Sequence, residues 1–170
     1  LNNLAYGLRI QGRYDEGLEI MARVIAVRRR VQGDDHPVLA ATLVNAAVMA
    51  ERGAKDELAL AYFREAVEIF VKADLPDDPK RLRSLVAIAR VEDRIAQATS
   101  ALGNCESAQS TAQIEQLNLA LRQEAQILSA ACLQRAGDIP AMHTWLARAR
   151  AQPLAPQVSK YAQRLLGALP

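Results

Sequence analysis

The chain has 170 residues, of which 51% are hydrophobic and 24% are charged, and its formal net charge is +2. This composition excludes an intrinsically disordered chain, and counts of Gly 8, Pro 7 and Cys 2 exclude collagen-like and disulfide-rich scaffolds. The near-neutral charge gives no support for binding nucleic acid or an anionic membrane, and the sequence lacks the apolar stretch of about 18 residues that a membrane span needs.

The first predicted elements are two helices. Apolar residues recur at helical spacing from Leu1 to Leu8, and Gly12 ends this helix. Asp15 begins a second helix, and residues 33–37 (GDDHP) break the chain after it. The positions of the second helix expected to face inward are Leu18, Met21, Val24, Ile25 and Val27. Because the sequence starts inside this pattern, without an initiator Met or a signal segment, we expect a fragment of a longer protein.

These two helices recur as a tandem repeat. Residues 1–5 (LNNLA) align with residues 43–47 (LVNAA) at an offset of 42. The same offset relates Pro37 to Pro79. An offset shared by a helix and a loop proline indicates a genuine repeat.

The repeat predicts a second helix pair. Its helices are expected at about residues 38–52 and 56–73, before a break at residues 76–79. Gly12 and Gly53 differ by 41 positions rather than 42. The turn between the paired helices is therefore predicted to shift by one residue in the second repeat.

The second half is more irregular but remains helical. A helix containing Leu85 is expected to run past the repeat's usual turn to Gly103. The next turn is predicted at Asn118. Asp138 is a good N-cap for a helix that ends near Gln152.

A last amphipathic segment at residues 156–169 suits a capping helix. The sequence thus predicts an all-α fold, a right-handed α-solenoid of antiparallel helix pairs. The repeat array is expected to cover residues 1–152, and the capping helix residues 153–170. The expected repeat units are 1–37, 38–79, 80–118 and 119–152.

Three motifs carry a resemblance to a known family: LNNLA at residues 1–5, QGRYDE at residues 11–16 and GDDHP at residues 33–37. Together they resemble the tetratricopeptide repeat (TPR) of kinesin-light-chain type. Small residues expected at the helix crossings agree with it: Ala5, Ala47, Ala89, Ala108, Ala130 and Ala149. Gly17 and Leu58 depart from it, because the family prefers Ala there.

The resemblance implies about four TPR-like repeats that act as a protein–protein interaction scaffold. It also implies a place in a larger regulatory protein, as in C-terminal segments of bacterial signalling proteins such as Ser/Thr kinases.

No set of residues predicts catalysis, a cofactor or a metal site. The sequence has neither a glycine-rich phosphate loop nor the kinase signature residues, and no His or Cys set has zinc spacing. His36 is expected to have a structural role beside a helix start, and His143 to lie at the surface or to be partly packed. We therefore expect a protein that is not an enzyme.

Cys105 and Cys132 are expected to be buried free thiols, with a redox pair as the alternative. Reduced thiols are typical of the cytosol, so the first interpretation predicts a cytoplasmic protein.

The predicted function is peptide binding in a concave groove lined by the first helix of each pair. The resemblance places the motif asparagine there, as Asn3 and Asn45, and an amide side chain can bond to a peptide backbone. Arg83, Arg90 and Arg94 share one helix face and would favour an acidic peptide, unless they only solvate a long helix. The complete set of expected partner-binding residues is Asn2, Asn3, Tyr6, Asn45, Arg52, Arg83, Arg90 and Arg94.

The fourth unit is expected to add Glu124, Ile127 and Arg135 to this groove. An alternative function is self-association, because Leu1, Leu4 and Leu8 would expose an apolar face that could form a homodimer. A structural spacer is a further alternative. RNA binding by helical repeats is disfavoured by the charge of +2 and the 4% aromatic content.

Overall fold

The computed structural model describes residues 2–98 and 105–170, with side chains for residues 3–97 and 105–170. This part of the chain forms nine helices and no strand, which confirms the predicted all-α fold. It divides into two compact units, Leu1–Ser84 and Leu85–Pro170. We call them the N-terminal unit and the C-terminal unit and describe each by itself.

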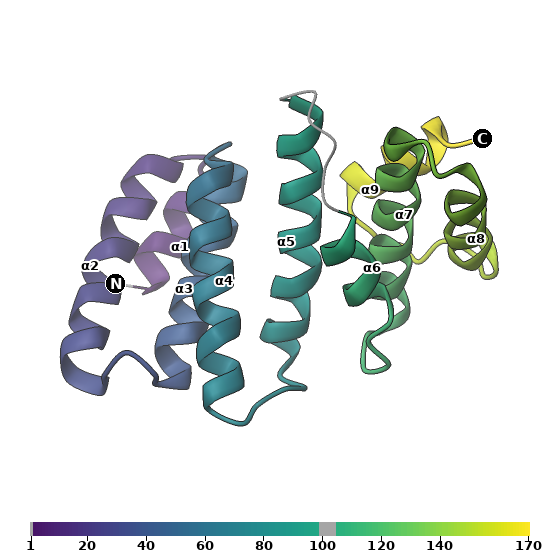
Figure 1. The fold of residues 1–170 in the computed structure, drawn as a ribbon. Helices are drawn as coiled ribbons and strands as arrows, with labels where there is room; N and C mark the ends of the chain where they lie inside the picture. The colour runs from purple at the N-terminus through teal and green to yellow at the C-terminus, as the bar shows by residue number, and fades with distance from the viewer. Residues whose placement is uncertain (1, 99–104) are drawn as a thin grey trace. The chain divides into compact units, whose positions relative to one another are not determined.

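The N-terminal unit contains two antiparallel helix pairs (Figure 1). Its helices are α1 (Asn2–Ile10), α2 (Tyr14–Gln32), α3 (Pro37–Arg52) and α4 (Asp56–Lys72). Each helix packs against the next along the chain. The helices predicted at residues 38–52 and 56–73 are thus confirmed to within one residue at each end.

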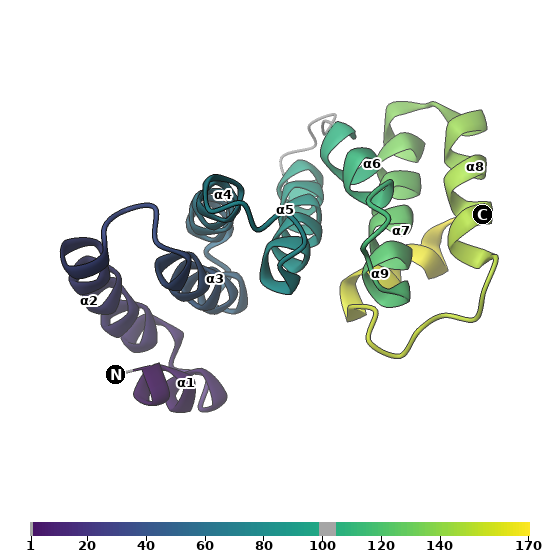
Figure 2. The same ribbon diagram turned by 90° about the horizontal axis from the view of Figure 1, so that it is seen from below.

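The C-terminal unit is organised around one central helix. It contains most of α5 (Pro79–Ala98), then α6 (Glu106–Ala112), α7 (Leu119–Ala136), α8 (Ile139–Arg150) and α9 (Lys160–Ala168). Helix α7 packs against α6, α8 and α9, and Figure 2 shows it between α6 and α8. The end predicted for the long helix at Gly103 lies outside the described residues.

The predicted helix starts of this unit are confirmed by their caps. The Asn118 side chain accepts a hydrogen bond from the Leu121 amide at 3.0 Å, and Asp138 accepts one from the Ala141 amide at 3.1 Å. Each bond satisfies one of the amides that a first helical turn leaves without a partner.

The turn inside the first two repeats keeps the 42-residue offset. Gly12 has φ +76° and Ala54 has φ +57°, so the left-handed residue of the second turn is an alanine. In the first turn the Arg13 amide donates to the Leu8 carbonyl at 2.9 Å. In the second turn the Lys55 amide donates to the Ala50 carbonyl at the same distance. The one-residue shift predicted from Gly53 is therefore wrong. The sequence comparison aligned the two glycines, whereas the left-handed backbone conformation stays 42 positions after Gly12, at Ala54.

The start of each repeat is also built the same way twice. His36 accepts a hydrogen bond from the amide two residues later at 3.1 Å, and Asp78 does the same at 2.7 Å. A proline follows each cap and begins the helix. The buried hydroxyls of Thr42 and Ser84, also 42 positions apart, donate to the carbonyl four residues earlier. The structural role expected of His36 is thus confirmed.

The small residues predicted at the helix crossings are all buried: Ala5, Ala47, Ala89, Ala108, Ala130 and Ala149. A Cβ at Gly17 would lie 2.2 Å from the Met49 Sδ, so glycine permits this close approach. The residue 42 positions after Gly17 is the fully buried Ala59, so the departure predicted at Leu58 is wrong. Val27 is 50% exposed, because it lies two positions after the inward-facing Ile25 and so points to the other side of the helix.

Helix α7 is buried on all sides from residue 123 to residue 133. Gln123, Glu124 and Ser129 of this stretch form hydrogen bonds within the chain. The Gln123 amide group donates to the carbonyls of Ala149, Gln152 and Pro153, and its oxygen accepts from the Ala155 amide at 2.9 Å. Gln123 thereby fixes the start of the segment that leads to α9.

A disulfide joins Cys105 to Cys132, with their Cα atoms 5.6 Å apart. The prediction of two free thiols is therefore wrong. Cys105 lies directly before α6, and Cys132 lies on α7, the helix on which α6 packs. This proximity depends on tertiary packing, which a separation of 27 residues in sequence does not reveal. The disulfide also removes the observation on which the cytoplasmic prediction depended.

Candidate peptide-binding site

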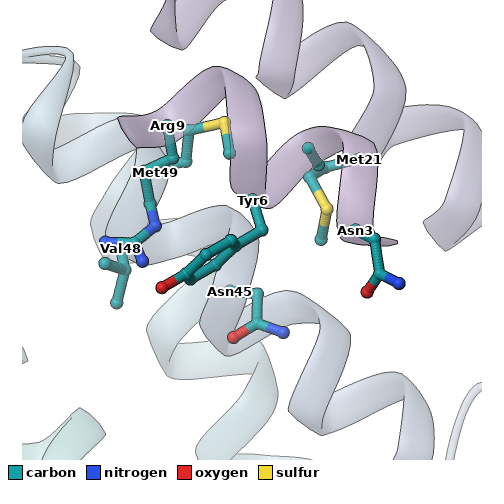
Figure 3. A pocket seen from close by; sticks show the side chains of 8 residues that line it. Asn3, Tyr6, Arg9, Met21, Asn45, Val48 and Met49 are labelled. Atoms are coloured by element: carbon teal, nitrogen blue, oxygen red, sulfur yellow. The ribbon is translucent and has the colours of Figure 1, made fainter. Parts of the chain in front are cut away.

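The N-terminal unit has a pocket of about 360 Å³ where α1, α2 and α3 meet. Ala5, Met21 and Met49 are buried and form its apolar part. Its polar residues are Asn3, Tyr6 and Arg9 from α1 and Asn45 from α3, with Val48 beside them (Figure 3). Three residues predicted to bind a partner, Asn3, Tyr6 and Asn45, thus line one pocket.

The helix geometry explains this convergence. Asn3 and Tyr6 lie three residues apart on one face of α1, and Asn45 lies 42 positions after Asn3 on the corresponding face of α3. All three side chains are exposed, although their neighbours Ala5 and Ala46 are buried. Figure 3 shows the Tyr6 ring extending from α1 toward Asn45 and Val48.

The pocket offers hydrogen bonds and one positive charge. Each asparagine amide provides two donors and an acceptor, and the Tyr6 hydroxyl adds a further donor. The Arg9 guanidinium lies 4.8 Å from the centre of the Tyr6 ring, at cation–π distance. No acidic residue is among those that line the pocket. The site therefore suits a segment with free backbone groups and a nearby carboxylate.

Two other predicted residues flank this pocket in sequence. Asn2 lies in α1, and its side chain is outside those described. Arg52 is exposed on α3, four positions after Val48 and therefore on the same helix face. Arg9 also lines the pocket, as its helical spacing from Asn3 and Tyr6 predicts, although it is not in the predicted set of partner-binding residues.

The predicted arginines of α5 have different surroundings. Arg83 is exposed. Arg90 donates to Glu124 of α7 at 2.6 Å, and the Arg94 guanidinium lies 5.9 Å from the centre of the Tyr161 ring in α9. Arg90 and Arg94 thus have partners within the chain, 34 and 67 positions away, which helical spacing alone could not indicate.

The groove residues expected from the fourth unit are not exposed. Ile127 belongs to the core at 0% exposure, and Glu124 is 3% exposed. Arg135 forms an ion pair with Asp93 of α5. The expectation that these three residues line an open groove is wrong, because α7 is covered by its neighbours.

Within the described residues, no group of three or more His, Cys, Asp or Glu could hold a metal ion. His143 is exposed on α8, as predicted. In the same part of the chain, no helix combines the length and apolar character required to span a membrane.

Comparisons with known proteins agree with this geometry. A family model described as tetratricopeptide repeat matches residues 1–72, the part of the chain that forms the pocket. No curated protein matches the chain.

Solved structures resemble the chain over nearly its whole length. One contains the nearly identical TPR-like repeats of a putative kinesin light chain from Podosopora anserina, with 20% identity, 98% of this chain and 82% of that chain covered, and a TM-score of 0.71. A variant of the same protein has a TM-score of 0.73 at the same identity and coverage. BtubC (BKLC) from P. vanneervenii has 18% identity and a TM-score of 0.71, with 97% of this chain and 61% of that chain covered. The predicted resemblance to repeats of kinesin-light-chain type is thereby confirmed.

Proposed function

We propose that this chain binds a peptide segment of a partner protein in the pocket between α1, α2 and α3. The match of residues 1–72 to the tetratricopeptide repeat supports this proposal, because such repeats generally mediate protein–protein interactions. The observation that carries this proposal is the convergence of two asparagine amides, a tyrosine hydroxyl and an arginine over an apolar floor. The amides bond to the peptide backbone, and the floor receives an apolar side chain.

The partner segment has acidic character in this proposal. Arg9 lines the pocket without an acidic neighbour in it, and Arg52 is exposed further along the same face of α3. A carboxylate of the partner would form a charge-assisted hydrogen bond with either guanidinium. In this proposal the other predicted residues belong to the partner surface of their own unit, Asn2 and Arg83 in the N-terminal unit and Arg90 and Arg94 in the C-terminal unit.

A displayed library of random peptides of about twelve residues, selected on the full chain, tests the proposal. Selected peptides should be enriched in Asp or Glu, and their affinities can be measured by fluorescence polarisation. The double substitution Asn3→Ala and Asn45→Ala should weaken binding by about tenfold or more, because each lost hydrogen bond costs about 1 kcal/mol. Arg9→Gln should remove the preference for a Glu-containing peptide over its Gln counterpart.

Gln32→Ala is the matched control, because Gln32 is an exposed amide on α2 that does not line the pocket. It should leave the affinity unchanged. Selected peptides that bind the asparagine double variant as tightly as the wild type would refute the assignment of this pocket.

We further propose that the chain belongs to a larger bacterial signalling protein, and the motif resemblance supports this proposal. Alkylation in intact cells tests the predicted cytoplasmic compartment against the Cys105–Cys132 disulfide. Labelling of both thiols would indicate the cytoplasm, whose reductants keep thiols reduced, and protection of both would indicate an oxidising compartment.

Self-association is a second candidate, favoured by exposed apolar side chains on α1. Leu4 is 55% exposed and Ile10 is 68% exposed, although Leu8 is buried and Leu1 lies outside the described residues. Light scattering over a concentration series distinguishes the two functions. If the chain forms a homodimer, its mean molar mass should rise with concentration, and Leu4→Lys should lower that mass. A peptide-binding monomer should show neither change.

A further inference from the structure

The C-terminal unit buries two carboxylates between α5 and α7. Asp93 of α5 is 6% exposed, and Glu124 of α7 is 3% exposed. Arg90 of α5 donates to Glu124 at 2.6 Å, and Arg135 of α7 forms an ion pair with Asp93. Each carboxylate thus has an arginine partner on the facing helix.

The last segment of the chain binds the same two carboxylates. Ser159, the N-cap of α9, donates to Glu124 from its hydroxyl at 2.8 Å and from its amide at 3.3 Å. The Tyr161 hydroxyl donates to Asp93 at 2.7 Å. Burial, and then this hydrogen bond, raise the pKa of Tyr161, so the hydroxyl keeps its proton. The attachment of α9 therefore depends on a short row of hydroxyl–carboxylate bonds.

The apolar part of this attachment is continuous with the core of the C-terminal unit, against which Leu165 and Leu166 pack. Ala162 is the one buried residue of α9, while Val158 and Leu169 are buried on either side of the helix. Tyr161 and Leu165 pack, partly buried, against Ala89, Ala108 and Leu128. A nine-residue helix is not stable alone in water, so α9 depends on this docking for its structure.

Detachment of α9 would leave a surface that is partly polar and partly apolar. Glu124 and Asp93 would keep their bonds to Arg90 and Arg135 and gain hydration in place of two hydroxyls. The chain before α9 would stay in place, because Gln123 holds it as far as Ala155. The uncovered face would present two carboxylates beside apolar core residues, a combination that suits an amphipathic helix.

We propose that the face of α5 and α7 beneath α9 is a binding site for an amphipathic helix of a partner protein, and that α9 occupies it as an intramolecular ligand. The recognised pattern is a serine N-cap, a tyrosine two positions later, an alanine three positions later and a leucine six positions later. In this chain these residues are Ser159, Tyr161, Ala162 and Leu165. A partner helix with the same pattern competes with α9 for Glu124 and Asp93. This site is separate from the pocket in the N-terminal unit, so either proposal can fail without the other.

A labelled synthetic peptide of residues 155–170 tests the proposal on the full chain by fluorescence polarisation. Ala162→Glu should expel α9, because Ala162 is 0% exposed and leaves no room for a charged side chain. The variant should then bind the peptide about tenfold or more tightly than the wild-type chain, whose site is occupied. A peptide with Tyr161→Ala should bind the variant about tenfold more weakly than the native peptide.

Gly167→Glu is the matched control, because it adds the same charge to α9 at an exposed position where a Cβ would meet no atom within 4 Å. It should bind the peptide as weakly as the wild type. The proposal would be overturned if the wild-type chain and both variants bound the peptide equally. It would also be overturned if an Ala162→Glu chain with native helical content and native Trp145 emission did not bind the peptide.

Amide hydrogen exchange of the unchanged chain gives a second test that needs no variant. If α9 detaches separately, its amides at residues 160–168 should exchange about a hundredfold or more faster than those of α7. Exchange of α9 and α7 at one common rate would show that they open only together and would exclude a displaceable helix.

Discussion

The N-terminal unit uses the same interactions twice, whereas the C-terminal unit also depends on long-range contacts that each occur once. In the first, the cap at His36 recurs at Asp78 and the turn at Gly12 recurs at Ala54, each 42 positions later. In the second, the disulfide and the Arg90–Glu124 pair join residues 27 and 34 positions apart. A repeated sequence can build its core from local signals, while an irregular one needs particular long-range partners.

The largest effect is expected from the apolar core of the N-terminal unit. Phe63 of α4 is 1% exposed, so Phe63→Ala should lower the free energy of unfolding by about 3–5 kcal/mol through lost burial and a cavity. Urea unfolding followed by circular dichroism should show an earlier transition for this unit. Trp145, the chain's single tryptophan, lies buried in the C-terminal unit and reports on that unit alone. An equal fall of the tryptophan midpoint would show that the two units unfold together.

Reduction of the disulfide should destabilise the other unit by a similar or slightly smaller amount. A closed loop of 27 residues corresponds to about 3.5 kcal/mol in the chain-entropy description. With dithiothreitol the urea midpoint of Trp145 fluorescence should fall, while the transition of the N-terminal unit should not change. Cys105→Ser is the control, because it should have the low midpoint already and show no response to the reductant.

A smaller effect of opposite sign is expected at the turn before α4. Ala54 has φ +57°, a conformation that costs an L-residue about 1–2 kcal/mol. Ala54→Gly removes that strain but makes the unfolded chain more flexible by about 0.4–1 kcal/mol, so a net gain of about 0.5–1 kcal/mol is expected in urea unfolding. Ala73→Gly is the matched control, because Ala73 ends α4 at φ −82° and should give no gain. A loss of stability in Ala54→Gly would contradict the strain argument.

The smallest effect concerns alkaline pH. The pKa of Tyr161 is raised in the folded chain by burial and by its bond to Asp93, whereas in the unfolded chain this pKa is about 10. Above that pH the unfolded state loses this proton and the folded state keeps it, so this group's contribution to stability declines as the pH rises. The urea midpoint of Trp145 fluorescence, measured from pH 9 to 11, should therefore fall more steeply in the wild type than in Tyr161→Phe. Parallel curves would show that Tyr161 does not couple to folding.

Sequence reasoning succeeded where a local signal determines a local structure. Asn118 and Asp138 were recognisable as helix starts, because a capping side chain bonds to an amide three residues away. Asn3 and Asn45 were recognisable as neighbours, because the repeat offset places them on corresponding helix faces.

Sequence reasoning failed where tertiary packing determines which residues are in contact. Arg90 and Arg94 have the spacing of a charged stripe, yet Glu124 and Tyr161 reach them from distant helices. Cys105 has no spacing signal that indicates its bond to α7. At Ala54 the residue type misled, because alanine occupies a conformation that usually selects glycine.

The equivalence of Asp78 and His36 makes residues 37–78 an exchangeable cassette. A second copy inserted after Asp78 would join Asp78 to another Pro37, which reproduces an N-cap followed by a helix-starting proline. The inserted copy would end on its own Asp78 before Pro79, so the original junction would be kept as well. The array could thus be lengthened by whole helix pairs without the design of any new junction.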